Sequence, residues 1–334
     1  MTGPNGKQEG IATDRKKIIV VVAVALLLLA AIIGVALWER GNNQFSGQDG
    51  TTQNTLTYQG KEYEFRQDIE TILLLGLDAF KDEEDDSYNN DKQADFLLLL
   101  VIDRTNETCR AIPINRDTMA EMNVLGVAGD KVGTITQQLA LAHTYGNGRE
   151  VSCRNVANAV SGLLKGVKID HYVSVTMEAV SIYNDTLGGV TLEVLDDFTH
   201  VDAALVKGET VTLKGEQALT YIRARHGMED PTNPSRMKRQ KQYMEALHTQ
   251  TRAAAAGDED FLSRAALKIS NYMVSDCSGN KLESLLDRLA QYELGGILEI
   301  EGDSTMGEKF LEFHPDEDSL MKVVVESFCR EKNK

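Results

Sequence analysis

The chain is short of aromatic residues and of positive charge. Aromatic side chains make up 6% of its 334 residues, so a hydrophobic core would be mainly aliphatic. Lys and Arg number 35 against 51 Asp and Glu, which gives a formal net charge of −16. Binding to a nucleic-acid backbone needs a basic face, so this balance argues against general nucleic-acid affinity. A local anion site stays possible, because salt screens exposed charges beyond about 8 Å.

Cysteine is also scarce, at four residues. Cys109, Cys153, Cys277 and Cys329 lie far apart and match no metal-ligand spacing. Outside the cell they could form one or two disulfides, and free buried thiols are an equally good interpretation.

One long hydrophobic run lies near the N-terminus. Residues 18–38 form 21 positions without a charged side chain. As a helix the run would be about 32 Å long, against a bilayer core of about 30 Å. Basic residues 15–17 precede it, so the positive-inside rule predicts a cytoplasmic tail over 1–17 and an extracellular remainder. Signal peptides have apolar regions of about 7–15 residues, so we expect an uncleaved single-pass anchor in the plasma membrane rather than a leader.

The rest of the chain predicts an α/β protein. Residues 39–67 are rich in Gly, Asn, Gln and Thr, which is typical of a flexible stalk. Continuous apolar runs, with one more polar strand pattern, predict strands, most of them covered on both faces, at 69–78, 94–103, 109–115, 171–177 and 190–194. Helices are expected at 134–145, 150–164 and 177–189.

This alternation favours an α/β/α sandwich with a mixed central sheet. We expect the sandwich to occupy residues 68–255 as one domain. Residues 256–334 are expected to add a C-terminal extension of three helices, packed on that domain.

Two carboxylates occupy neighbouring ends of the first two predicted strands. Asp78 ends the first strand, and Asp95 begins the second. If the strands pair antiparallel, these residues meet at an edge of the sheet, where ligands bind in α/β folds. Together they could hold one Mg²⁺ through oxygen ligands. The alternative is that each acid merely ends its strand.

A basic–acidic pair follows the third strand. Arg116 and Asp117 lie in the loop after it. One interpretation gives Arg116 a phosphate group to bind and Asp117 a supporting role, and the alternative is a surface ion pair.

Residues 221–240, YIRARHGMEDPTNPSRMKRQ, gather basic side chains in an acidic protein. If the chain is extended at its start, Arg223 and Arg225 share one face of a strand. Arginine's planar fork suits phosphate oxygens, so the pair is a candidate anion site.

The second half of that segment is typical of a helix start. Asn233 can cap the helix, and Pro234 suits its first turn. Arg236, Arg239 and Gln240 would then lie on one side, near backbone N–H groups that favour anions. A solvated basic helix face is the alternative.

The order of these motifs resembles the LytR-CpsA-Psr family. The matching segments, over about residues 68–250, are ILLLGLD, DFLLLLVID, IPINRDTM, DTLGGVTLEV, LKGEQALTYIRARH and RMKRQ. The resemblance implies an extracytoplasmic phosphotransferase that uses Mg²⁺ or Mn²⁺. Such an enzyme moves a glycopolymer, such as a teichoic acid or capsule polymer, from a polyprenyl-pyrophosphate carrier onto peptidoglycan. Lipid pyrophosphate hydrolysis is an implied side activity.

The resemblance also implies roles for individual residues. Asp78 and Asp95 would hold the metal. The implied pyrophosphate ligands are Arg116, Lys131, Arg223, Arg225, Arg236 and Gln240, with Arg239 beside them. The implied catalytic residues are Arg116, Asp117, Arg223 and Arg225. Asp95 or Asp117 could take the proton of the attacking hydroxyl.

Five positions depart from the family's pattern. They are Gln93, Phe96, Asn115, Gly133 and Asn233. The charged centres are kept while supporting residues differ, so a second hypothesis is a non-catalytic polyprenyl-pyrophosphate-binding or regulatory envelope protein. Transcription regulation is a third hypothesis, and the predicted topology and the acidic charge argue against it.

Overall fold

The computed structural model describes residues 55–81, 90–224, 233–258, 261–278 and 292–332, with Lys281, Ser284, Leu285 and Arg288 between them. The expected cytoplasmic tail and the apolar run at 18–38 lie outside these residues. Among the described helices, none combines the length and the apolar character that a membrane crossing requires.

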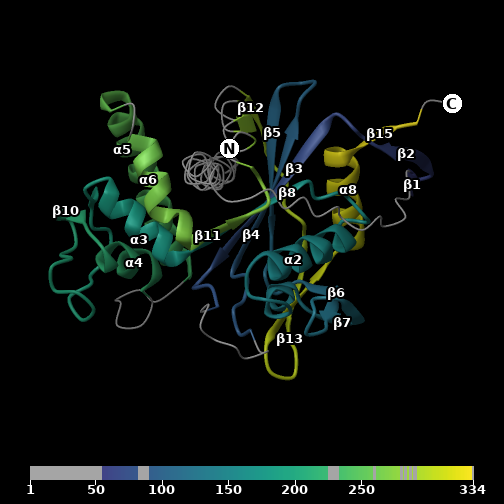
Figure 1. The fold of residues 1–334 in the computed structure, drawn as a ribbon, viewed down its shortest axis with the longest axis horizontal. Coiled ribbons are helices and arrows are strands. Elements are labelled where there is room, and N and C mark those ends of the chain that lie inside the picture. The colour runs from purple at the N-terminus through teal and green to yellow at the C-terminus, as the bar shows by residue number, and fades with distance from the viewer. Residues whose placement is uncertain are drawn as a thin grey trace, which may run out of the picture. The chain divides into compact units, whose positions relative to one another are not determined.

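The described residues divide into two compact units, each of which contains its own strands and helices (Figure 1). We call the first the sheet unit: it comprises the described parts of Trp38–Thr176, Tyr272–Ser278 and Asp287–Lys334. The second, the helical unit, comprises the described parts of Met177–Asn271 and Gly279–Leu286.

A six-stranded sheet forms the centre of the sheet unit. Its strand order is β11 (Met273–Ser275), β8 (His171–Thr176), β3 (Ile69–Leu77), β4 (Phe96–Asp103), β5 (Thr108–Ile114) and β12 (Glu293–Ile297). β3 pairs antiparallel with β4 and parallel with β8, and β12 runs parallel to β5. The predicted mixed central sheet is therefore confirmed.

Aliphatic side chains on both faces of β3 and β4 explain why these runs are strands. Leu73 and Leu99 belong to one hydrophobic cluster, together with side chains of α2 (Glu150–Leu163) and α8 (Glu317–Phe328). Successive side chains of a strand alternate between faces, so Leu74 and Leu98 point the other way, and they are also buried. Burial on both faces is what selects a continuous run rather than alternation.

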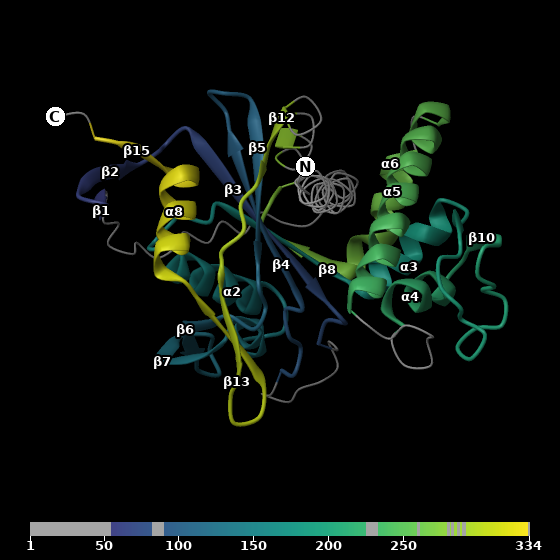
Figure 2. The ribbon, with the colours of Figure 1, turned by 180° about the vertical axis from the view of Figure 1, so that it is seen from behind.

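The predicted stalk is wrong in its last part. β1 (Thr55–Tyr58) and β2 (Lys61–Phe65) form an antiparallel hairpin, and β15 (Cys329–Glu331) pairs with β2. Figure 2 shows these strands beside α8. The segment is polar because one side of this small sheet is exposed, and its strands depend on hydrogen bonds to a segment about 265 residues away in sequence.

The helix expected at 134–145 is also wrong. β7 (Lys131–Gln138) pairs antiparallel with β6 (Met119–Leu125), and only η2 (Leu139–Thr144) is helical, as a 3-10 turn. In the sequence KVGTITQQ, the β-branched residues Val132, Thr134 and Thr136 occupy alternate positions. β-Branched residues favour strands, and β6 lies beside this segment to pair with it.

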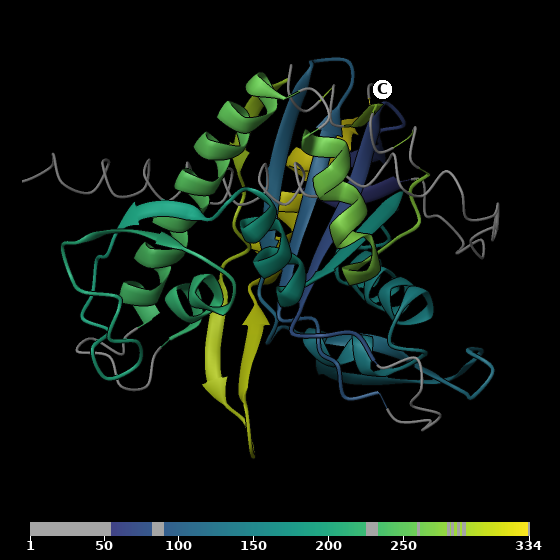
Figure 3. The same cartoon turned by 60° about the vertical axis from the view of Figure 1, so that its left-hand side comes forward.

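The segment expected to form a C-terminal extension of three helices contains α6 (Phe261–Ile269) and α8, and its described residues also form five strands. β11 and β12 add the two edge strands of the central sheet, and β13 (Gly302–Met306) and β14 (Leu311–Pro315) form a hairpin (Figure 3). Edge strands this short gain their hydrogen bonds from the existing sheet, so the local sequence does not specify them.

The helical unit contains α3 (Met177–Thr186), β9 (Val190–Glu193), β10 (Thr210–Leu213), α4 (Glu216–Arg223), α5 (Asn233–Gly257) and α6. The chain is not extended at Arg223, as the shared strand face of Arg223 and Arg225 would require, because Arg223 is the last residue of α4. Ala218, Leu219 and Ile222 are buried at helical spacing. Gly215 precedes the helix with a φ of 51° and a ψ of −132°, a conformation open mainly to glycine.

A half-buried ion-pair cluster lies at the C-terminal end of β4. Arg66 contacts both Asp68 and Asp103 at 2.7 Å. Asp103 also accepts the backbone N–H groups of Thr105 and Asn106 at 3.0 Å. Burial by itself would raise the pKa of Asp103, but the Arg66 and Asn106 hydrogen bonds outweigh it and lower the pKa to about 2.

This cluster predicts a pH-dependent stability. The folded-state pKa of Asp103 lies below the unfolded value of about 3.9, so its stabilisation is present above pH 4 and is lost as the pH falls toward 2. We expect Asp103→Asn to lower the unfolding free energy by about 2 kcal/mol at pH 7 and by much less at pH 2. Urea titrations at both pH values measure this. Glu62→Gln is the control, because its pair with Lys332 is exposed and we expect a loss below about 0.5 kcal/mol. An equal loss for Asp103→Asn at both pH values would contradict the assignment.

Candidate functional site

The two predicted metal carboxylates lie at one end of neighbouring strands. The β3–β4 ladder ends at the Gly76–Phe96 pair, and the Asp95 backbone N–H donates to the Gly76 carbonyl at 2.8 Å. Asp78 follows β3 and Asp95 precedes β4 at this edge. The antiparallel pairing on which a shared edge depends is therefore present.

Arg116 joins these strand ends from the loop after β5. Its guanidinium forms an ion pair with Asp95 and donates to Gln93 Oε1 at 2.7 Å. Its backbone carbonyl accepts the N–H of Ala140 at 3.0 Å, which fixes the loop against η2. The side chains of Arg116 and Asp95 are each 37% exposed, so the pair is open to a solute. The structure brings Arg116 and Asp95 together, which the family resemblance implied and the residue pattern alone did not.

Gln93 acts here as a neutral acceptor. It lies two residues before Asp95 and binds the same guanidinium. Because it is uncharged, it orients Arg116 without neutralising it. Arg116 therefore carries one formal counter-charge in direct contact from Asp95, and Asp117 lies farther away, at 3.6 Å from Nε.

Asp117 is held from three sides, as a supporting residue would be. Its backbone N–H donates to Asn115 Oδ1 at 3.0 Å, and its carbonyl accepts the N–H of Phe313 at 2.8 Å. Gln138 Nε2 donates to Asp117 Oδ1 at 3.1 Å and to the Leu311 carbonyl at 2.7 Å. Gln138 thus links this loop to the β13–β14 hairpin.

Gln138 is a site residue that the sequence did not indicate. It ends β7 and pairs with Met119, two residues after Asp117. Because a helix was expected at 134–145, the pairing of Gln138 with Met119 was not predicted. The turn residues at 126–130, GVAGD, were the one local signal for a hairpin that would have placed Gln138.

Lys131 lies at the other end of the same hairpin. It pairs with Leu125 next to the turn, whereas Met119, nearest Arg116, pairs with Gln138. Six residues of extended strand correspond to about 20 Å. The structure does not group Lys131 with Arg116, contrary to its predicted role as a pyrophosphate ligand beside it.

The remaining predicted ligands belong to the helical unit. Arg223 is exposed at the C-terminal end of α4. Arg225 lies outside the described residues, and so do the side chains of Arg236 and Gln240. Their roles stay predictions.

Arg239 is not a ligand site in this structure, contrary to the prediction. Its side chain is 1% exposed and donates four hydrogen bonds within the protein. Nη1 donates to Asp196 Oδ2 at 2.5 Å and to Ser235 Oγ at 3.1 Å. Nε donates to the Tyr221 carbonyl at 2.9 Å, and Nη2 donates to the Ala224 carbonyl. With four of five N–H groups used internally, it has little left to offer an anion.

The partners of Arg239 give it a structural role. Tyr221 and Ala224 belong to the last turn of α4 and its C-cap, whose carbonyls have no partner within the helix. Arg239 supplies that partner from α5, and its positive charge suits the negative end of the helix dipole. The guanidinium also stacks over the Phe198 ring, 5.4 Å from the centroid. Arg239 therefore fixes the end of α4, where Arg223 lies.

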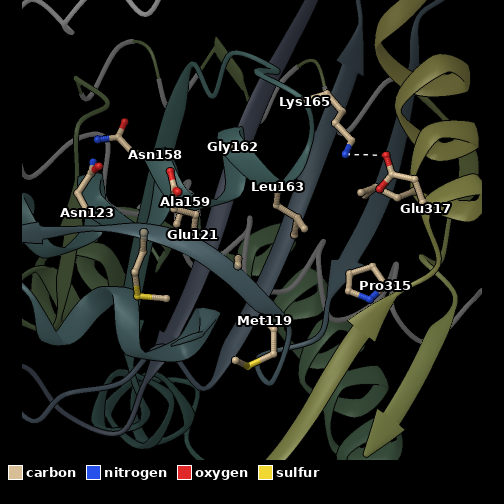
Figure 4. Close-up of a pocket in the computed structure, with 13 residues that line it drawn as sticks. Met119, Glu121, Asn123, Asn158, Ala159, Gly162, Leu163, Lys165, Pro315 and Glu317 are labelled. Atoms are coloured by element: carbon tan, nitrogen blue, oxygen red, sulfur yellow. Dashed lines mark ion pairs between the residues drawn. The ribbon is translucent and has the colours of Figure 1, made fainter. Parts of the chain in front are cut away.

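A cavity of about 380 Å³ opens beside β6 in the sheet unit (Figure 4). α2 and the start of α8 complete its wall, and an ion pair of 2.8 Å joins Lys165 to Glu317 at its rim. Met119, Met122 and Leu163 supply apolar lining. Asp78, Asp95 and Arg116 do not line it, so the cavity is separate from the Arg116 site.

Curated proteins of two Bacillus species are similar in sequence to part of this chain. TagU of Bacillus licheniformis, a polyisoprenyl-teichoic acid–peptidoglycan teichoic acid transferase, is 31% identical over 180 residues, which cover 53% of this chain and 50% of that protein. TagU of Bacillus subtilis is 30% identical over 185 residues, or 54% and 52% of the two chains. The chain thus spans about half the length of these curated relatives.

Solved structures share the fold. The crystal structure of B. subtilis TagV superposes with a TM-score of 0.54 at 22% identity, over 78% of this chain and 98% of that one. B. subtilis TagU gives 0.51 at 20% identity, over 80% and 100%. The LytR_cpsA_psr family model matches residues 40–323. The match covers most of the sequence, and the chain therefore belongs to the LytR-CpsA-Psr family.

Proposed function

We propose that this protein is a cell-envelope phosphotransferase that moves a glycopolymer from a polyprenyl-pyrophosphate carrier onto peptidoglycan. Family membership and the named activity of the TagU relatives support this proposal. The observation that carries it is the exposed Arg116–Asp95 pair at the edge where β3 ends and β4 begins. A guanidinium held in a fixed direction and open to solvent suits a phosphate oxygen.

The proposed reaction exchanges one phosphorus–oxygen bond for another. A hydroxyl of the peptidoglycan acceptor attacks the phosphorus next to the sugar, and the bond from that phosphorus to the bridging pyrophosphate oxygen breaks. Polyprenyl phosphate leaves with that bond's electron pair. The hydroxyl proton passes to a carboxylate, for which Asp95 and Asp117 are the candidates at the site. Catalysis of this kind depends mainly on positioning and charge stabilisation.

Arg116 has the main electrostatic role in this proposal. Moving from Asp95 to the phosphoryl oxygens, its guanidinium would replace one anionic partner by another of higher charge. Gln93 would keep one edge of the guanidinium oriented during this change. Asp117, fixed by Gln138 and Phe313, supports the loop that carries Arg116.

Asp78 and Asp95 suit a hard divalent cation. Both are carboxylates at the same sheet edge, and Mg²⁺ prefers oxygen ligands of this type. We propose that they would hold Mg²⁺ or Mn²⁺, which neutralises charge on the pyrophosphate when bound.

We also propose that the protein works outside the cell. The apolar run at 18–38 would anchor it in the plasma membrane with residues 1–17 in the cytoplasm.

The mixed sheet would be the central layer of an α/β/α sandwich, with one of its faces covered by α2 and α8.

The decisive test supplies the full chain, in lipid nanodiscs, with a lipid-pyrophosphate-linked glycopolymer, peptidoglycan oligomers and Mg²⁺. We expect a phosphodiester-linked product and an equal amount of polyprenyl phosphate, both measured by mass spectrometry. Binding of the lipid without either product would contradict the proposed transferase activity and favour a non-catalytic lipid-binding protein. Release of lipid phosphate without the linked product would show hydrolysis alone.

Lys131 provides a prediction that separates the structure from the sequence pattern. We expect Lys131→Ala to change the transfer rate by less than about threefold, because a charge about 20 Å along the hairpin is screened from the Arg116 site. The same nanodisc assay measures it. A loss as large as that of Arg116→Ala would show that Lys131 binds the pyrophosphate and that the hairpin bends toward it.

A further inference from the structure

A cluster of His171, Asp276 and Cys277 lies at the end of the sheet opposite to the Arg116 site. His171 begins β8 and pairs with Ile72 of β3, whereas Asp78 follows the other end of β3, about 20 Å along the strand. β11 runs antiparallel to β8 and leads directly into Asp276 and Cys277. Two edge-proximal strands thus bring together residues about 105 positions apart in sequence.

The donor atoms in this cluster are spaced for a metal ion. One donor atom from each of the three residues lies within 4.8 Å of the others. His171 Nδ1 is 3.5 Å from Asp276 Oδ1, which exceeds an ordinary N–H···O bond of about 2.9 Å. Two ligands of a tetrahedral zinc ion at about 2.05 Å are separated by about 3.4 Å. His171 Nδ1 is buried, and it makes no hydrogen bond of ordinary geometry with any of the described residues.

The surroundings fix each donor in place. His171 Nε2 faces Glu70 Oε1 at 3.6 Å, and Glu70 is itself held by Arg288 at 3.0 Å. A carboxylate on the far nitrogen is the usual arrangement that turns the other nitrogen of a histidine toward a metal. The Tyr172 backbone N–H donates to Asp276 Oδ1 at 3.0 Å.

The third donor is equally constrained. The Cys277 backbone N–H donates to Ser275 Oγ at 3.0 Å, and Ser275 Oγ donates to the Tyr172 carbonyl at 2.9 Å. All four cysteines are free thiols in this structure, and Cys277 is 4% exposed. The side chain of Asp276 is 33% exposed and leaves a route for an ion.

We propose that His171 Nδ1, Asp276 and Cys277 form a zinc site, with water as the fourth ligand. A nitrogen, oxygen and sulfur donor set selects Zn²⁺ over the hard ions Mg²⁺ and Ca²⁺. Bound Zn²⁺ would link the segment after β11 to the start of β8. The site is independent of the Arg116 site and of the proposed transfer reaction.

The test uses the full chain in detergent, stripped of metal by a chelator. Titration with Zn²⁺ in a calorimeter, in excess Mg²⁺ to occupy the carboxylates of Asp78 and Asp95, is expected to show one site per chain. Co²⁺, used as a spectroscopic substitute, is expected to give a thiolate-to-metal charge-transfer band that Zn²⁺ removes. Cys277→Ser should abolish the band, and His171→Ala should weaken Zn²⁺ binding by at least about tenfold.

Matched controls separate the site from incidental binding. Cys329→Ser and His314→Ala change a thiol and an imidazole outside the cluster, and both should retain the band and the affinity. Asp95→Asn should retain them as well. Wild-type protein without a thiolate band, or a band that persists in Cys277→Ser, overturns the proposal. The wild-type cobalt spectrum decides the matter even where a variant fails to fold.

Discussion

Arg116→Ala is expected to lower the rate of glycopolymer transfer by roughly 10³-fold, because an arginine that neutralises charge in a phosphoryl-transfer transition state contributes about 10³–10⁵ in rate. Arg116 is placed for this role by its contacts with Asp95 and Gln93 at the edge of the sheet. Arg116→Lys keeps the charge but loses the planar fork that can face Gln93 and a phosphate together. Its rate should fall between those of the wild type and Arg116→Ala.

The assay is the nanodisc transfer reaction, with product measured as linked glycopolymer per unit time. Arg104→Ala is the matched control, because Arg104 also follows a strand end and its side chain donates, within the described part of the chain, only to the backbone carbonyls of Gln67 and Asp68. We expect it to keep its rate within about threefold. Thermal unfolding of each variant checks that the fold is intact. Transfer by Arg116→Ala at a third of the wild-type rate or more would remove Arg116 from the mechanism.

The second large effect concerns stability. Arg239→Ala should lower the unfolding free energy of the helical unit by about 3–4 kcal/mol, because removing one partner of a buried charge pair leaves the other uncompensated. Asp196, 18% exposed, would lose its guanidinium partner. The carbonyls of Tyr221 and Ala224 would lose their donors, and the ring of Phe198 would lose its stacked cation.

Chemical denaturation followed by circular dichroism measures this loss. Lys238→Ala is the matched control, since Lys238 is the adjacent cation in α5 and its side chain is exposed. Its effect should stay within about 0.5 kcal/mol. Arg239→Lys should also be destabilising, since an ammonium cannot reach Asp196 and two carbonyls in one plane. A loss below about 1 kcal/mol for Arg239→Ala would show that the network is not needed for the fold.

The sequence predicted the strands of the sheet centre well because their signal is local. A run such as ILLLGL can be buried only where both faces are covered, and β3, β4 and β5 all formed within three residues of the expected bounds. The common edge of Asp78 and Asp95 was conditional on antiparallel pairing of the two strands, and the structure has that pairing. The sequence placed Arg116 in the loop just after the third strand, and only the family resemblance implied its role at the site.

Other features needed contacts that no local pattern contains. The residues before Arg223 form the helix α4 because Ala218, Leu219 and Ile222 are buried on one side of it. The sequence of this segment is also compatible with a short strand. Residues 131–138 became a strand because β6 lies beside them. Gln138 reached Asp117 only through that register.

By itself, the sequence predicted the mixed sheet and determined the charge of the 221–240 segment, and it left the shared edge of Asp78 and Asp95 conditional on antiparallel pairing. Tertiary structure decided what the charges do. Arg239 carries the same formal charge as Arg116, but one is enclosed by Asp196 and helix-end carbonyls while the other stays open at a sheet edge. His171 and Cys277 met because β8 and β11 pair across about 100 residues of chain. The spacing of residues along a helix or strand determines which side chains lie on the same face. The burial of those side chains and the geometry of their donor atoms depend on which distant segments pack against that face.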